Sequence, residues 1–118
     1  SPGYFYSPTV LSGVDPDARV VTEEIFGPVA PVVAFGDDDE GLALANATEY
    51  GLAAYAYTAS LDRAVRVSEE VEAGMIGINR GMVSDASAPF GGLKQSGLGR
   101  EGGEAGLEEY LETVYVAL

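Results

Sequence analysis

Short apolar segments recur along the chain at intervals that suit strands separated by helices. Four segments are rich in apolar, aromatic or β-branched residues: residues 4–11, 29–35, 52–58 and 75–79. Their length and composition predict strands, and the continuous apolar character of 29–35 and 75–79 is typical of buried strands.

Two amphipathic helices are predicted between these strands. Asp37 can cap the first helix, and Glu40 stands three residues later, which is the spacing of a capping box. This helix is expected to run to about Thr48. Ser60 can cap the second helix, whose apolar residues fall on one face, and Gly74 is expected at the C′ position that ends it.

The alternation of strand, helix, strand, helix and strand predicts the fold class. It indicates an α/β protein with a layered sheet, flanking helices and parallel pairing of strands. Residues 80–103 are expected to form a loop, residues 104–110 a short helix, and residues 111–118 a final strand. We therefore divide the chain into a main body, 1–110, and a C-terminal strand, 111–118.

The net charge of this protein disfavours two classes of partner. The 118 residues carry 19 acidic and 6 basic side chains, a formal net charge of −13. Phosphate backbones and anionic membrane surfaces would be repelled, so we expect neither nucleic acid nor membrane as a partner. No apolar run approaches the roughly 18 residues of a membrane span, and no signal-peptide pattern opens the chain, so we expect a cytoplasmic protein. Since no initiator Met precedes the first strand, we also expect a piece cut from a longer chain.

The absence of Cys and His excludes several kinds of chemistry. Disulfides, thiolate metal sites, cysteine nucleophiles and the usual Ser-His-Asp triad cannot be built from these residues. The acidic run at 37–40 is interpreted as a helix start, because a calcium loop needs ligands spread over about twelve residues. We therefore expect no metal site and no self-contained nucleophilic chemistry.

A glycine-rich segment invites comparison with phosphate-binding loops. Residues 97–102 match the spelling G-x-G-x-x-G, but no clear strand precedes them, so we reject a dinucleotide fingerprint here. Taken alone, the glycines indicate a loop that needs positive φ angles or close backbone packing.

Four motifs in order nevertheless resemble one known family. They are Glu23-Glu24-Ile25-Phe26-Gly27-Pro28-Val29, Asn46-Ala47-Thr48-Glu49-Tyr50-Gly51-Leu52-Ala53-Ala54, Gly74-Met75-Ile76-Gly77-Ile78-Asn79, and Pro89-Phe90-Gly91-Gly92-Leu93-Lys94-Gln95-Ser96-Gly97-Leu98-Gly99-Arg100-Glu101. Together they resemble the C-terminal part of the catalytic domain in the aldehyde dehydrogenase superfamily. The tail through Glu112 is most similar to its succinate-semialdehyde dehydrogenase branch.

The resemblance implies a cofactor contact in the first motif. The second glutamate of that motif contacts the nicotinamide ribose in the family, and this role falls on Glu24. The aromatic residue packs near the nicotinamide ring, and this role falls on Phe26. A carboxylate can accept two hydrogen bonds from a cis-diol, and an aromatic side chain can restrain a flat ring. The cofactor would be NAD or NADP. Without the family match, a helix-start carboxylate and a core Phe would be the preferred interpretation.

The resemblance also implies substrate contacts. Phe90 matches the aromatic residue that lines the aldehyde pocket, and Ser84 matches a serine that contacts the distal carboxylate in the succinate-semialdehyde branch. The alternative for Ser84 is a solvated loop serine. Arg80 lies close in sequence, but the arginine of that branch lies upstream, so Arg80 receives no role.

Subunit contacts follow from the same resemblance. Arg100 and Glu112 match residues of an ion-pair network at a subunit interface, and the strand 111–118 would join a sheet across a homo-oligomer. The alternative for both side chains is an exposed position of little energetic value.

The family reaction needs residues that this chain lacks. A cysteine thiolate attacks the aldehyde to form a thiohemiacetal, hydride passes to the nicotinamide, and a glutamate activates water. Both residues lie upstream of the Glu23–Val29 motif in the family, as does the cofactor domain. We therefore expect an active parent enzyme and an inactive fragment. Two alternatives stay open: a stand-alone, non-catalytic oligomerisation module, and a branch that acts on an uncharged aldehyde.

Overall fold

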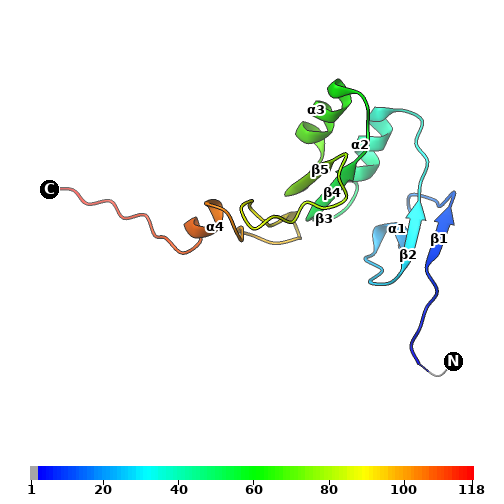
Figure 1. Cartoon of the computed structure of the whole chain (residues 1–118), viewed down its shortest axis with the longest axis horizontal. Helices are drawn as coiled ribbons and strands as arrows, with labels where there is room; N and C mark the ends of the chain where they lie inside the picture. The colour runs from blue at the N-terminus through cyan, green and yellow to red at the C-terminus, as the bar shows by residue number, and fades with distance from the viewer. Residues whose placement is uncertain (1–2) are drawn as a thin grey trace. The chain divides into compact units, whose positions relative to one another are not determined.

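The computed structural model describes residues 3–118, and among them it contains four helices and six strands (Figure 1). The chain divides into two compact units, the first ending at Leu44 and the second spanning Ala45–Leu118. Parallel pairs form in both units, which confirms the predicted α/β class and parallel pairing. No helix within the described residues has the length and apolar character needed to cross a membrane.

The first unit is built around a parallel strand pair. Strand β1 (Thr9–Ser12) pairs with β2 (Val29–Val32), and the short helix α1 (Arg19–Thr22) lies between them in sequence. Residues 29–35 were predicted to be a buried strand, but the strand stops at Val32 and its side chains alternate between half-buried and exposed. Within the unit only one face of β2 is covered, so the apolar run does not correspond to burial on both faces.

Helix α2 (Asp38–Asn46) begins as the capping box predicts. The Glu40 amide donates to Asp37 Oδ1 over 2.9 Å, and the Glu40 carboxylate accepts from the Gly36 amide over 2.6 Å. These two bonds satisfy backbone donors that a helix start leaves without partners.

The second unit pairs β4 (Ala53–Ala56) in parallel with β5 (Met75–Ile78), joined by helix α3 (Leu61–Glu70). Strand β3 (Tyr50–Gly51) pairs antiparallel with β6 (Leu93–Lys94), a pairing that the sequence did not suggest. The short helix α4 (Ala105–Glu108) lies inside the predicted range 104–110. The Ser60 hydroxyl accepts from the Arg63 amide over 3.3 Å, so the predicted cap of α3 is confirmed.

The prediction that Gly74 ends α3 is wrong. The helix ends at Glu70, and the extended Val71 follows as its C-cap. The side chain of Asn46 explains this early end, because its amide nitrogen donates to the Glu70 carbonyl and its oxygen accepts from the Glu72 amide. Gly74 instead directly precedes β5, at a point where an added Cβ would collide with the Gly91 carbonyl oxygen. Gly74 is therefore required for close approach of two backbones.

Apolar burial within the chain is small. Among the described residues, only Leu42 and Met75 are buried hydrophobic side chains, with 9% and 8% exposure, whereas many large apolar side chains are exposed. Residues 111–118 are exposed and form no strand within the single chain. A strand that pairs with another subunit forms only in the oligomer, so the oligomerisation role of this segment stays a prediction.

Candidate functional site

The segment after α1 presents two adjacent glutamates in different ways. Arg19 Nε donates to Glu23 Oε1 over 2.7 Å and Arg19 Nη2 donates to Glu23 Oε2 over 3.0 Å. The guanidinium lowers the pKa of Glu23, and the carboxylate raises the pKa of Arg19. Glu24 is exposed and has no hydrogen-bond partner within residues 3–118. Of the two carboxylates, Glu24 is the one available to a ligand.

Phe26 stands beside an open hollow in the first unit. Its φ of 49° lies in the left-handed region, which is unusual for a bulky side chain, and the side chain is 93% exposed. Aromatic and apolar residues line a hollow of about 660 Å³: Tyr4, Phe5, Tyr6, Ile25, Phe26, Gly27, Pro28 and Val29. Strained backbone often occurs where a side chain is held for a ligand. This hollow can receive a flat, partly apolar ring.

The loop after β5 carries Ser84. Asn79 turns the chain at a φ of 54°, and both polar atoms of its side chain bond the backbone of Thr58 over 2.8 Å. Ser84 is exposed, and its hydroxyl has no partner among the described residues. Asp85 Oδ1 accepts from the Ser87 hydroxyl over 2.7 Å and from the Ser87 amide over 2.9 Å, and these bonds lower the pKa of Asp85.

Phe90 and Arg100 line a second pocket of about 250 Å³ in the second unit. Phe90 exchanges two backbone hydrogen bonds of 2.7 Å with Glu101, and its side chain is 40% exposed. Arg100 Nη1 donates to the carbonyls of Gly92 and Gly99 over 2.9 and 2.7 Å. Arg100 therefore holds the two ends of the glycine-rich turn together.

The predicted interface residues have different surroundings. Arg100 is half-buried, and its amide donates to Glu109 Oε1 over 3.2 Å, a contact that the sequence did not suggest. Glu112 is exposed and pairs with no residue in the range 3–118. Because the predicted network lies between subunits, both interface roles remain predictions.

Lys94 is a structural residue of this region that the sequence interpretation missed. Its Nζ donates to the carbonyls of Asn46 and Thr48 over 2.9 and 3.1 Å and forms an ion pair with Glu72 over 2.5 Å. The side chain is only 25% exposed. A lone lysine inside a glycine-rich segment, without a phosphate-binding spacing around it, was the available signal.

The glycine-rich segment is a closely packed loop. Gly97, Gly99 and Gly102 have positive φ, as predicted for this segment, and Gly51 donates its amide to the Ser96 hydroxyl over 2.9 Å. The strand before residues 97–102 is the two-residue β6, which pairs antiparallel with β3, and α4 starts only at Ala105. These residues therefore lack the strand–turn–helix arrangement that a dinucleotide fingerprint needs.

The structure thus brings some predicted residues together. Phe90 and Arg100 share the second pocket, whereas Ser84 does not line it. Phe26 lines the hollow of the first unit, whereas Glu24, two residues earlier in the sequence, does not line it.

The sequence is similar to those of known proteins over nearly its whole length. The profile of the Aldehyde dehydrogenase family matches residues 1–116. A succinate-semialdehyde dehydrogenase of Paenarthrobacter nicotinovorans is 56% identical over 117 residues, which are 99% of this chain and 26% of that protein. A 3-sulfolactaldehyde dehydrogenase of Pseudomonas putida is 53% identical over 116 residues, which are 98% of this chain and 24% of that protein. The chain therefore spans about a quarter of the length of these relatives.

Solved structures agree with the fold. An aldehyde dehydrogenase from Brucella melitensis biovar abortus 2308 superposes with a TM-score of 0.90 at 56% identity, covering 95% of this chain and 23% of that one. A betaine aldehyde dehydrogenase from Staphylococcus aureus in complex with NAD+ gives a TM-score of 0.87 at 44% identity, covering 92% of this chain and 21% of that one.

Proposed function

Because the chain belongs to the aldehyde dehydrogenase family, we propose that it is the C-terminal part of the catalytic region of an enzyme that oxidises succinate semialdehyde to the acid with NAD(P)+. The proposal rests mainly on two side chains of the Glu23–Val29 motif that are accessible to a ligand. Glu24 is unpaired beside an ion-paired Glu23, and Phe26 is exposed at a strained φ of 49°. The matched betaine aldehyde dehydrogenase, whose structure contains NAD+, supports this type of cofactor.

The residues present fit a nicotinamide riboside. The Glu24 carboxylate accepts hydrogen bonds from the two ribose hydroxyls, and Phe26 with the neighbouring aromatic hollow restrains the nicotinamide ring. When bound, this cofactor supplies the acceptor for the hydride that leaves the substrate. The chain itself binds and orients the cofactor.

Substrate recognition is assigned to the second unit. The unpaired Ser84 hydroxyl donates to the distal carboxylate, and Phe90 lines the aldehyde pocket with its half-exposed ring. The two curated relatives support an acidic substrate, since a succinate semialdehyde and a sulfolactaldehyde both carry an anionic group away from the aldehyde.

The reacting nucleophile and the base are assigned to an upstream part of the same protein. The chain contains no Cys, so the thiolate that attacks the aldehyde and the glutamate that activates water come from the remaining length that the relatives have. Residues 111–118, Arg100 and Glu112 contribute to contacts between identical subunits. The 118-residue chain alone is inactive in this proposal, and NAD(P)H formation by the pure chain with aldehyde contradicts it.

The adjacent glutamates offer a matched test of the cofactor role. In the full-length protein, Glu24→Gln is expected to raise the KM for NAD(P)+ about tenfold, the equivalent of one lost hydrogen bond to a charged group. Glu23→Gln is the control, because its carboxylate already bonds Arg19, and its KM is expected to stay within about twofold of the wild type. Equal effects in the two variants contradict the assignment of Glu24.

The substrate class is tested by comparing kcat/KM for succinate semialdehyde with that for butanal, an aldehyde of equal carbon number without the carboxylate. A strong preference for succinate semialdehyde supports the role of Ser84. A preference for butanal contradicts it and favours a branch that acts on uncharged aldehydes.

A second candidate is a stand-alone, non-catalytic module that only oligomerises. The exposed apolar side chains of residues 111–118 favour it, because such a segment gains from a partner. The coding sequence upstream of Ser1 separates the two candidates. A continuous frame with a Cys and a base Glu supports the enzyme, whereas a frame that starts near Ser1 supports the module.

A further inference from the structure

One position on a face of the β4–β5 pair has no side chain, because it is a glycine. Gly77 of β5 is buried and stands in register with Tyr55 of β4. A Cβ at Gly77 would lie 2.8 Å from Tyr55 Cδ1 and 2.9 Å from Val83 Cγ1. Real Cβ atoms essentially never approach other atoms that closely, so the missing side chain leaves room that the Tyr55 ring and the Val83 isopropyl group fill together.

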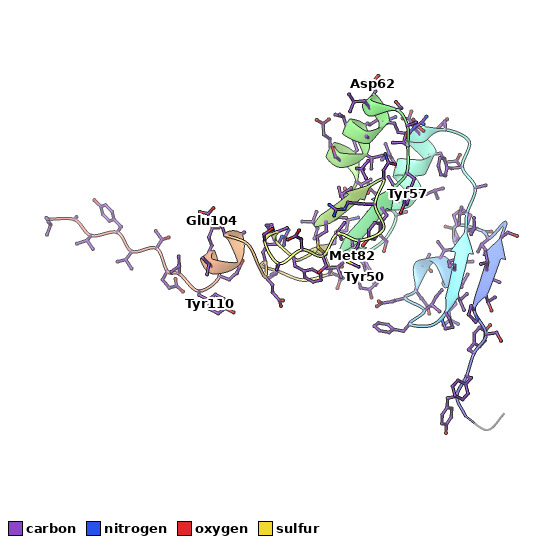
Figure 2. All side chains as sticks on the ribbon, viewed as in Figure 1. Tyr50, Tyr57, Asp62, Met82, Glu104 and Tyr110 are labelled. Atoms are coloured by element: carbon purple, nitrogen blue, oxygen red, sulfur yellow. The ribbon has the colours of Figure 1, made fainter. Side chains whose placement is uncertain are left out.

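The loop that carries Val83 lies on the face of this sheet that presents two tyrosines. Tyr55 lies in β4 and Tyr57 directly follows the end of that strand, so the strand alternation, continued by one residue, directs both rings to the same face. A Cβ at Gly81 would lie 3.6 Å from the Tyr57 hydroxyl oxygen, an ordinary van der Waals contact. Tyr57, which follows β4, and Met82, in the loop after β5, are both labelled in Figure 2. The segment from Gly81 to Val83 thus follows the sheet surface.

Asn79 begins the return of the chain onto this face. It adopts a φ of 54°, and its side chain bonds the Thr58 backbone at the end of the neighbouring strand. Asn79 fixes the start of the loop, and Val83 in the space over Gly77 fixes the loop four residues later. Ser84 directly follows this second anchor.

We propose that Gly77 is a specificity-determining residue, because its missing side chain seats Val83 against the sheet and thereby sets the position of the Ser84 hydroxyl for the distal carboxylate of the substrate. Gly77 acts through Val83 and does not touch the substrate. The inference rests on the substrate role of Ser84 proposed above. It adds which residue sets the position of the Ser84 hydroxyl.

The seating of Val83 is tested by NMR on the full-length protein, labelled selectively at valine, tyrosine and serine. The wild type is expected to show nuclear Overhauser contacts between the Val83 methyl groups and the Tyr55 ring. Gly77→Ala is expected to abolish them and to shift the Ser84 amide resonance. Gly81→Ala is the matched control for loop position, because its Cβ fits without displacement. Retention of the Val83–Tyr55 contacts in Gly77→Ala overturns the proposal.

The specificity role is tested in the full-length protein. Gly77→Ala is expected to raise the KM for succinate semialdehyde about tenfold, as for one lost hydrogen bond to a charged group, and to leave kcat/KM for butanal within about twofold. Val83→Ala removes the anchor without adding bulk, so it remains informative if Gly77→Ala fails to fold. It is expected to raise the same KM in the same direction.

The double variant sharpens this test. Because the added methyl of Gly77→Ala occupies space that Val83→Ala vacates, the two changes together are expected to cost less than the product of their separate effects. Equal losses for both aldehydes, or an unchanged KM in Gly77→Ala and Val83→Ala, overturn the role of Gly77 while the proposed function stands. A wild-type preference for butanal instead overturns the Ser84 assignment, and the specificity role with it.

Discussion

Replacing Asn79 is expected to release the end of β4 from the end of β5. Asn79 Nδ2 donates to the Thr58 carbonyl and Asn79 Oδ1 accepts from the Thr58 amide, both over 2.8 Å. The side chain thus continues the strand pairing after the backbone of β5 has turned away at a φ of 54°. Asn is among the few side chains that tolerate this region, so one residue supplies both the turn and the pairing.

The magnitude follows from these two contributions. Each hydrogen bond contributes roughly 0.5–1 kcal/mol, toward the lower end of the usual range because the site is exposed. A non-Asn, non-Gly residue in the left-handed region costs about 1 kcal/mol more. Asn79→Ala is therefore expected to cost about 2–3 kcal/mol. Asn79→Gly loses the hydrogen bonds but adopts the turn without strain, so it is expected to cost about 1–2 kcal/mol.

Amide hydrogen exchange at Thr58 is the suitable assay, because it reports local opening without requiring cooperative unfolding of the whole chain. A cost of 2 kcal/mol corresponds to about 30-fold faster exchange. Asn46→Ala is the matched control, since Asn46 bonds the backbone of Glu70 and Glu72 in the same way. It is expected to accelerate exchange at Glu72 and to leave Thr58 unchanged.

Two results would refute this reasoning. Unchanged exchange at Thr58 in Asn79→Ala means that the two hydrogen bonds do not hold the strand ends together. Faster exchange in Asn79→Gly than in Asn79→Ala means that the left-handed turn carries no cost for alanine.

Three further predictions concern the second unit. Gly74→Ala brings its Cβ against a backbone carbonyl, so it is expected to lower the free energy of unfolding by about 3 kcal/mol in urea titrations. Gly27→Ala is the control, because its Cβ fits without a collision and no comparable loss is expected. Lys94→Met removes two hydrogen bonds from a charged donor and is expected to cost about 1–2 kcal/mol in the same titration. An unchanged urea midpoint contradicts a stabilising role for the bonds from Lys94 to the Asn46 and Thr48 carbonyls. Hydrogen bonds from Ser87 lower the pKa of Asp85 in the folded chain. This contact therefore stabilises the fold fully at pH values above the pKa of an unfolded aspartate, about 3.9. The stabilisation is lost as the pH falls through the pKa that Asp85 has in the folded chain. Ser87→Ala is expected to raise that pKa in a carboxyl NMR titration, and an unshifted pKa excludes the contact in solution.

Local signals in the sequence predicted the helix starts and the order of the elements. Asp37 with Glu40, and Ser60, cap their helices through contacts within four residues, so the chain itself carries the information. The short apolar segments likewise predicted strands, although the structure shortens most of them. The family motifs identified the candidate residues Glu24, Phe26 and Phe90, since their order and spacing are readable without coordinates.

The sequence alone could not predict contacts between distant residues. The end of α3 depends on Asn46, which lies 24 residues before Glu70, so the nearby Gly74 was a misleading local signal. The role of Lys94 depends on carbonyls 46 and 48 residues away. Burial was also mispredicted for residues 29–35, because an apolar run does not state which of its faces another element covers.

The family, the fold class and the candidate residues for cofactor and substrate contacts could be predicted from the sequence, because they follow from short-range pattern and from motif order. The tertiary structure was needed to show that a Cβ at Gly74 or Gly77 would collide with neighbouring atoms, and that the Asn79 side chain bonds Thr58, which lies 21 residues earlier. The physical reason is that each of these features is set by an atom of a residue remote in sequence or by an empty volume, and neither is written in the local order of residues.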